Sequence, residues 1–179
     1  AAHPEDNPEG YWERRDIYQA HVDFFRALDM DWDRIAGFGP GHFAEPAAGI
    51  LRERLAALLP DLDRHRPWLL KDPRLSLLLP TWTGLVPDAA VVVAVRHPLA
   101  IAASLAATPR GIFPTAMVLA LWEKYLLRLL ADLGDRPAVF VSYERLLAAP
   151  KAELARLARL LAEQGGPTLA VPPPERIAT

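Results

Sequence analysis

The sequence predicts an α/β fold in which helices flank a doubly wound parallel sheet, within a single domain over residues 1–179. With 179 residues, of which 51% are hydrophobic, the chain is long enough for one core and short for two. Residues 89–95 contain the run Val-Val-Val-Ala-Val, which is typical of a strand covered on both faces. Apolar runs alternate with helical patterns over the second half of the chain, which favours parallel strands joined by helices.

Two helices are expected before the first strand. Residues 11–30 have apolar side chains at roughly helical spacing, and residues 45–59 have them more clearly, opposite the charged positions 52–54. The second helix should therefore be amphipathic and lie at the surface. Its expected apolar stripe consists of Ile50, Leu51, Leu55, Leu58 and Leu59.

In the rest of the chain, strands are expected to alternate with helices. Strands are expected at residues 67–71, 89–95 and 138–143, and helices at residues 98–107, 114–133 and 150–164. Pro98 stands at a first helical position, where its missing N–H costs little, and Gly134 and Gly165 stand where helices end. The glycine-rich stretch at residues 37–41 has no lysine, serine or threonine, which predicts a turn and excludes a phosphate-binding loop there.

Composition limits the classes of partner. A net charge of -2 and a pI near 6.2 provide no basic field, so we expect no nucleic-acid partner. There is no cysteine, which excludes disulfides and thiolate sites. No signal peptide and no apolar run of about 20 residues is visible, which predicts a cytoplasmic protein without a membrane span. The histidines are too scattered to predict a metal site.

An anion site is expected where residues 89–95 end. Arg96 follows the strand directly and precedes the helix that begins at Pro98, and a helix start offers free N–H donors and a partial positive charge. Ser104 lies eight residues further on, too deep in the helix to cap it. Taken alone, these residues are explained better by an exposed ion pair of Arg96.

The segment from Arg96 to Ser104, with its Arg-His-Pro turn, resembles the 3′-phosphate motif of sulfotransferases that use 3′-phosphoadenosine 5′-phosphosulfate (PAPS). In that family the matching arginine and serine hold the 3′-phosphate of the nucleotide. The resemblance implies a P-loop-like doubly wound parallel sheet, with Arg96 and Ser104 on this phosphate.

Three further segments carry the same resemblance. Lys71-Asp72-Pro73 is similar to a Lys-x-Pro segment of bacterial members, and Tyr143-Glu144, followed by a proline at 150, is similar to the family's Tyr-Glu-x-Leu segment. Residues 7–13 resemble the family's Asn-Pro-x-Gly-Tyr-x-Glu stretch. The four segments stand in the family's order and span most of residues 6–160.

The sequence departs from the family in two ways. No Gly-Ser/Thr-rich loop for the 5′-phosphosulfate precedes residue 7, so we expect the first β-α unit to be missing from this chain. Pro73 stands where cytosolic members have a catalytic histidine, so the base must come from elsewhere. Carboxylates serve as the base in Golgi and several bacterial members.

The resemblance supplies four more candidate residues. Glu13 is the first candidate for the base and Glu9 the second, while Lys71 could stabilise charge on the phosphosulfate and Tyr143 could pack beside the adenine. Each has a structural alternative. Glu13 could support the first turn of its helix, Lys71 could pair with Asp72 or Glu144, and Tyr143 could form the edge of the core.

The sequence therefore predicts a metal-free sulfotransferase that moves a sulfuryl group from PAPS to a hydroxyl or amine of a small-molecule or carbohydrate acceptor. Trp122 and Tyr125 are expected in the core or in the wall of the acceptor pocket. A non-catalytic binding module of the same fold and a nucleotide kinase remain alternatives. A kinase would need a Walker lysine upstream of residue 1 and carboxylates for magnesium.

Overall fold

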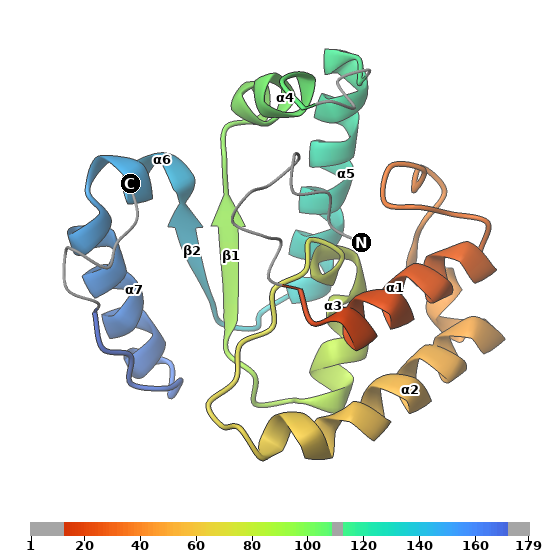
Figure 1. Cartoon of the computed structure of the whole chain (residues 1–179), viewed down its shortest axis with the longest axis horizontal. Helices are drawn as coiled ribbons and strands as arrows, with labels where there is room; N and C mark the ends of the chain where they lie inside the picture. The colour runs from red at the N-terminus through yellow and green to blue at the C-terminus, as the bar shows by residue number, and fades with distance from the viewer. Residues whose placement is uncertain (1–12, 109–112, 172–179) are drawn as a thin grey trace.

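The computed structural model describes residues 13–108 and 113–171. Two parallel strands, β1 (Val91–Val95) and β2 (Ala138–Ser142), lie side by side with helices on both sides of them (Figure 1). The helices are α1 (Arg15–Ala27), the 3₁₀ helix η1 (Pro40–Ala44), α2 (Pro46–Asp63), α3 (Leu75–Leu85), α4 (Pro98–Ala106), α5 (Thr115–Leu133), α6 (Tyr143–Ala148) and α7 (Pro150–Glu163). The predicted α/β fold with a parallel sheet is confirmed.

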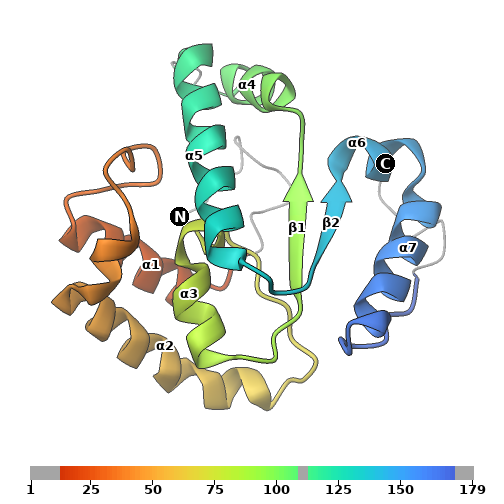
Figure 2. The ribbon, with the colours of Figure 1, turned by 180° about the vertical axis from the view of Figure 1, so that it is seen from behind.

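The two strands are joined by the crossover that parallel pairing requires, here α4 and α5. Val93 of β1 is buried against Leu79 of α3 and Leu129 of α5, while α7 packs beside β2 on the other side (Figures 1 and 2). The register pairs Val91 with Ala138 and continues without a bulge to the last pair of the strands. The carboxyl ends of both strands therefore lie at the same edge of the sheet.

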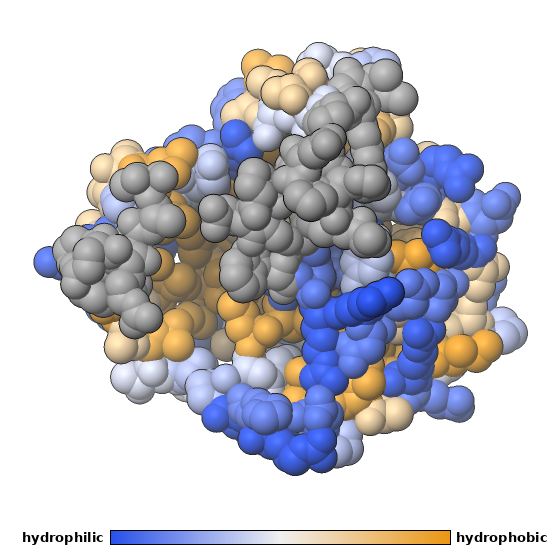
Figure 3. Space-filling model, in the orientation of Figure 1, coloured by the Kyte–Doolittle hydropathy of each residue, from blue (hydrophilic) through white to orange (hydrophobic). Residues whose placement is uncertain are grey.

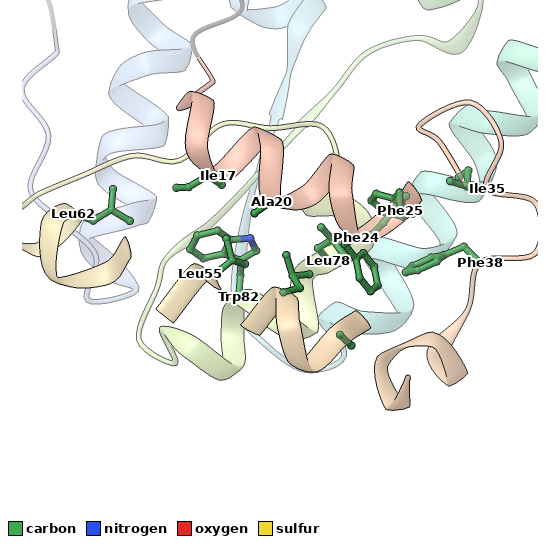
Figure 4. Packing of buried hydrophobic residues seen from close by; sticks show 13 residues of the cluster. Ile17, Ala20, Phe24, Phe25, Ile35, Phe38, Leu55, Leu62, Leu78 and Trp82 are labelled. Carbon is green, nitrogen blue, oxygen red and sulfur yellow. The ribbon is translucent and has the colours of Figure 1, made fainter. Parts of the chain in front are cut away.

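The main core lies between α1, α2 and α3 (Figure 4). Phe24 and Phe25 of α1 meet Phe38 through edge-to-face or tilted ring contacts, with ring centroids 5.3 to 6.3 Å apart. Leu55 from α2 and Leu78 from α3 are fully buried beside them. This packing fixes α1 against α2, α3 and the segment before η1.

Several predicted elements need correction. Residues 67–71 form no strand, because Pro67 has no N–H to donate and Leu69 is 87% exposed, while Trp68 and Leu70 pack against the main core and not against a partner strand. Ile50, expected in the apolar stripe of α2, is 67% exposed. Tyr143 begins a short helix, α6, instead of ending a strand.

Other predicted boundaries are confirmed. Pro98 is the first residue of α4, and Gly134 caps α5 with a φ of 53°, a left-handed conformation that glycine adopts without steric cost. Gly165 follows α7 in the same way, with a φ of 74°. Within the described ranges, every helix is too short or too polar to cross a bilayer.

The helical core predicts a contrast between two positions of α2. Leu55→Ala should lower the free energy of unfolding by about 2 to 5 kcal/mol, since Leu55 is completely buried and its removal leaves a cavity. Ile50→Ala is the matched control and should change the free energy of unfolding by less than about 0.5 kcal/mol. Urea denaturation followed by circular dichroism measures both, and equal losses would contradict the packing described.

Candidate functional site

The shared edge of β1 and β2 brings Arg96 and Tyr143 together. Val95 pairs with Ser142, so the residues that follow them emerge side by side. The guanidinium carbon of Arg96 lies 4.4 Å from the ring centroid of Tyr143, a cation–π contact. The Nε of Arg96 is buried and has no hydrogen-bond partner among the described residues. The arginine is thus oriented and retains an unsatisfied donor.

Glu144 ties the two strand ends together. Its Oε1 accepts from the backbone N–H of His97 at 2.8 Å, and its Oε2 accepts from the Ser142 hydroxyl at 2.9 Å. Hydrogen bonds from the N–H of His97, then from the backbone N–H of Glu144 itself and the Ser142 hydroxyl, hold the pKa of Glu144 below its ordinary value, so the carboxylate is ionised. Ser142 also accepts from the N–H of Arg145 and caps α6.

Backbone N–H groups at the start of α4, which the sequence suggested were free for an anion, already have acceptors within the protein. Besides the N–H that Glu144 takes, the N–H of Leu99 donates to Nδ1 of His97 at 3.3 Å, and Pro98 has no N–H. An anion there would meet Arg96 first and reach the Leu99 N–H only after the His97 ring turns away. Ser104 is exposed on α4, two turns further along the helix.

A second group of polar residues lies where the chain enters α1 and α3. Nζ of Lys71 is 2.7 Å from Oε1 of Glu13, and the side chains are 50% and 12% exposed. Lys71 therefore pairs with Glu13, whereas the sequence suggested Asp72 or Glu144. Glu13 precedes the N-cap of α1, so it does not belong to the first turn of that helix. Glu9 lies outside the described residues.

A buried histidine–carboxylate pair joins His21 to Asp72, the residue that follows Lys71 in the sequence. Nδ1 of His21 lies 2.8 Å from Oδ2 of Asp72, and both side chains are almost completely buried. The indole N–H of Trp82 donates to Nε2 of His21 at 3.0 Å. Because the indole can only donate, Nε2 must accept, which places the proton of a neutral ring on Nδ1, facing Asp72. The sequence did not indicate this pair, because its partners lie 51 residues apart.

Asp72 also holds Arg74. Its Oδ1 accepts from the backbone N–H of Arg74 at 2.8 Å and from Nη1 at 3.0 Å. Burial disfavours the charge on Asp72, but the hydrogen bond from His21 and the contacts with Arg74 outweigh it and keep the pKa of Asp72 below its ordinary value. The guanidinium carbon of Arg74 lies 4.6 Å from the ring centroid of Tyr18. Sequence analysis also missed Arg74.

The two groups border one cavity of about 2110 Å³. Glu13, Lys71, Arg74 and Arg96 line it, and so does Trp122, one of the predicted wall residues. Figure 3 shows an apolar hollow near β1 and a hydrophilic band over α1 and α2 beside it. Over residues 13–108 and 113–171 no cluster of three or more histidine, aspartate or glutamate side chains could hold a metal ion.

A family model described as the sulfotransferase family matches residues 1–164. The chain belongs to the sulfotransferase family. Neither the curated proteins nor the solved structures contain a match to it. Membership supports sulfuryl transfer as the general chemistry, and it agrees with the resemblance that the residues around Arg96 and Lys71 carry.

The buried Asp72 predicts an acid-dependent loss of stability. Its pKa in the folded chain lies below the ordinary 3.8, so its contribution is complete above that value and is lost as pH falls through the folded pKa. Asp72→Asn should therefore lose less stability than the wild type as the pH falls below the ordinary pKa of 3.8. At neutral pH the variant should be less stable by about 3 kcal/mol.

Urea denaturation at a series of pH values measures this difference. Asp88→Asn, at an exposed aspartate, is the control and should follow the wild-type profile. An Asp72→Asn profile parallel to that of the wild type would show that the carboxylate is not stabilised as the hydrogen bonds indicate.

Proposed function

We propose that this sulfotransferase takes its sulfuryl group from PAPS and that Arg96 binds the 3′-phosphate. The buried Nε of Arg96, which has no partner in the described part of the chain, is the observation that carries the proposal. A buried donor without an acceptor costs about 1 to 3 kcal/mol, and a phosphate oxygen would satisfy it with a charge-assisted hydrogen bond. The cation–π contact with Tyr143 fixes the orientation of the guanidinium before the ligand binds, which lowers the entropic cost of binding.

Ser104 and Tyr143 complete the nucleotide site in this proposal. The hydroxyl of Ser104 is exposed on α4 and serves as a second ligand of the 3′-phosphate. Tyr143 is 40% exposed, which leaves ring surface for the adenine in addition to the face under Arg96. Tyr143 would thus bind the base of the nucleotide, and Arg96 and Ser104 would bind its 3′-phosphate.

Glu13 and Lys71 are the proposed catalytic pair. The acceptor hydroxyl gives its proton to Glu13 while its oxygen forms a bond to sulfur. The bond from sulfur to the 5′-phosphate oxygen breaks in line, and 3′-phosphoadenosine 5′-phosphate leaves with the electron pair. The pair's 2.7 Å separation means that one bound group can contact both side chains, and Lys71 would stabilise the charge on the moving group. Glu9 stays the second candidate for the base.

We further propose that a β-α unit carrying the 5′-phosphosulfate loop completes the sheet beside β1. Among the described residues β1 pairs with a strand along one edge only, and all five of its residues line the cavity. Apolar side chains such as Val92, which is 41% exposed, would be covered by such a unit. The added loop would bring backbone N–H groups to the sulfuryl group.

Arg96→Ala should weaken binding of 3′-phosphoadenosine 5′-phosphate by about 2 to 4 kcal/mol, because a partly buried phosphate loses its fork of donors. Isothermal titration calorimetry measures the change. Arg159→Ala on α7 is the control, since Arg159 is exposed and pairs with Glu163 away from the cavity. Adenosine 5′-phosphate, which has no 3′-phosphate, should bind the wild type more weakly. If wild type and Arg96→Ala bind 3′-phosphoadenosine 5′-phosphate with equal affinity, the assignment of Arg96 to the 3′-phosphate is wrong.

Glu13→Gln should preserve nucleotide affinity and lower turnover by about 10² to 10⁴, the range of general-base contributions. The assay follows labelled sulfuryl transfer from PAPS to a panel of phenols, alcohols and amines, in a chain that carries the phosphosulfate loop. Glu163→Gln, at an exposed carboxylate of α7, is the control and should keep full turnover. Full turnover by Glu13→Gln would move the base to Glu9 or beyond.

A further inference from the structure

We propose that Arg74 is a second anion-binding residue of the cavity and that it selects acceptors with a carboxylate or sulfate on a ring. The proposal rests on the proposed function in one respect, namely that the acceptor enters the cavity lined by Lys71 and Glu13. Arg74 lies three residues after Lys71 and lines the same cavity. A group bound to Arg74 would therefore lie in the cavity that the proposed catalytic pair also lines.

Arg74 is rigidly held. The residue is 9% exposed, and its guanidinium is fixed on one side by Asp72 and on one face by the ring of Tyr18. Asp72 is itself anchored by His21, which Trp82 fixes in turn. An arginine that is already immobile loses little side-chain entropy when it binds a ligand.

The guanidinium is only partly used by these contacts. Asp72 engages Nη1, and within residues 13–108 and 113–171 neither Nε nor Nη2 of Arg74 has a hydrogen-bond partner. The Arg74 side chain lines the cavity and is 11% exposed. The Nε and Nη2 edge of arginine presents two parallel N–H groups, which match the two oxygens of a carboxylate or sulfate.

Asp72 does not require the whole guanidinium. Its Oδ2 is held by His21, and its Oδ1 already accepts a backbone N–H in addition to Nη1. A buried carboxylate with three donors is well compensated. The remaining edge of Arg74 is therefore available to a ligand without breaking the network.

Aromatic residues of the same cavity indicate the rest of the ligand. Tyr18, Trp32, Trp122 and Tyr125 line the cavity, and flat apolar walls of this kind suit the faces of a ring. The predicted ligand is a hydroxylated ring that carries an anionic group. A hydroxybenzoate and a uronic acid share this chemistry.

Calorimetric titration of the full chain with two matched pairs of ligands tests the proposal. 4-Hydroxybenzoate is compared with 4-hydroxybenzyl alcohol, and glucuronate with glucose. We expect the acid to bind at least about tenfold more tightly than its neutral partner in one pair, as expected for charge-assisted hydrogen bonds. The pair that shows the preference distinguishes an aromatic acceptor from an acidic sugar.

Arg74→Gln should reduce that preference to about twofold or less. Arg15→Gln is the control, because Arg15 is exposed and lines the same cavity, and it should keep the wild-type preference. If Arg74→Gln does not fold, Arg74→Lys keeps the charge without the fork and should still lose most of the preference. No acid preference in either pair, or an undiminished one in the Arg74 variants, overturns the proposal.

Affinity for 3′-phosphoadenosine 5′-phosphate is measured on the same samples. The Arg74 variants should retain it, because Arg96 is the residue assigned to the nucleotide. A wild type that prefers the acids but does not bind the nucleotide supports the anion site and contradicts the proposed function, so the two failures are distinguishable.

Discussion

The parallel pairing of β1 with β2 is the constraint on which the proposed nucleotide site depends. Because the register places Val95 opposite Ser142, the residues that follow the two strands are neighbours. Arg96 then stacks on Tyr143, and the carboxylate of Glu144 reaches the N–H of His97. A shift of one residue would turn every side chain of the strand to the opposite face and separate these partners. The turns after β1 and β2 lie far apart in the sequence, and only the pairing of the strands brings them together.

The proposed catalytic pair of Glu13 and Lys71 depends on a different constraint, the buried pair of His21 and Asp72. Burial of a carboxylate is costly unless donors surround it, and here α1 supplies one donor while the turn before α3 supplies the others. The pair therefore joins two elements far apart in sequence and sets the position of Lys71 and Arg74 between them. Trp82, which donates to His21, belongs to the helical core of α1, α2 and α3 and links the pair to it (Figure 4).

The sequence predicted those features that local patterns encode. The strand before Arg96, the proline at the start of α4 and the glycine after α5 depend on neighbouring residues, and all three are confirmed. The strand expected at residues 67–71 was wrong because hydrophobicity alone cannot tell whether a partner strand exists. Residues 58 positions apart meet in the pair of Glu13 with Lys71, and no spacing rule in one sequence reveals such contacts. Arg74 was missed for the same reason.

A crystal structure of the chain with 3′-phosphoadenosine 5′-phosphate would test the central claim most directly. The account predicts the 3′-phosphate within hydrogen-bond distance of Nε of Arg96, the His97 ring turned aside, and the hydroxyl of Ser104 as a further ligand. The adenine should lie beside Tyr143. A nucleotide bound with its 3′-phosphate on Lys71 or Arg74, leaving Arg96 without an anion, would contradict the account.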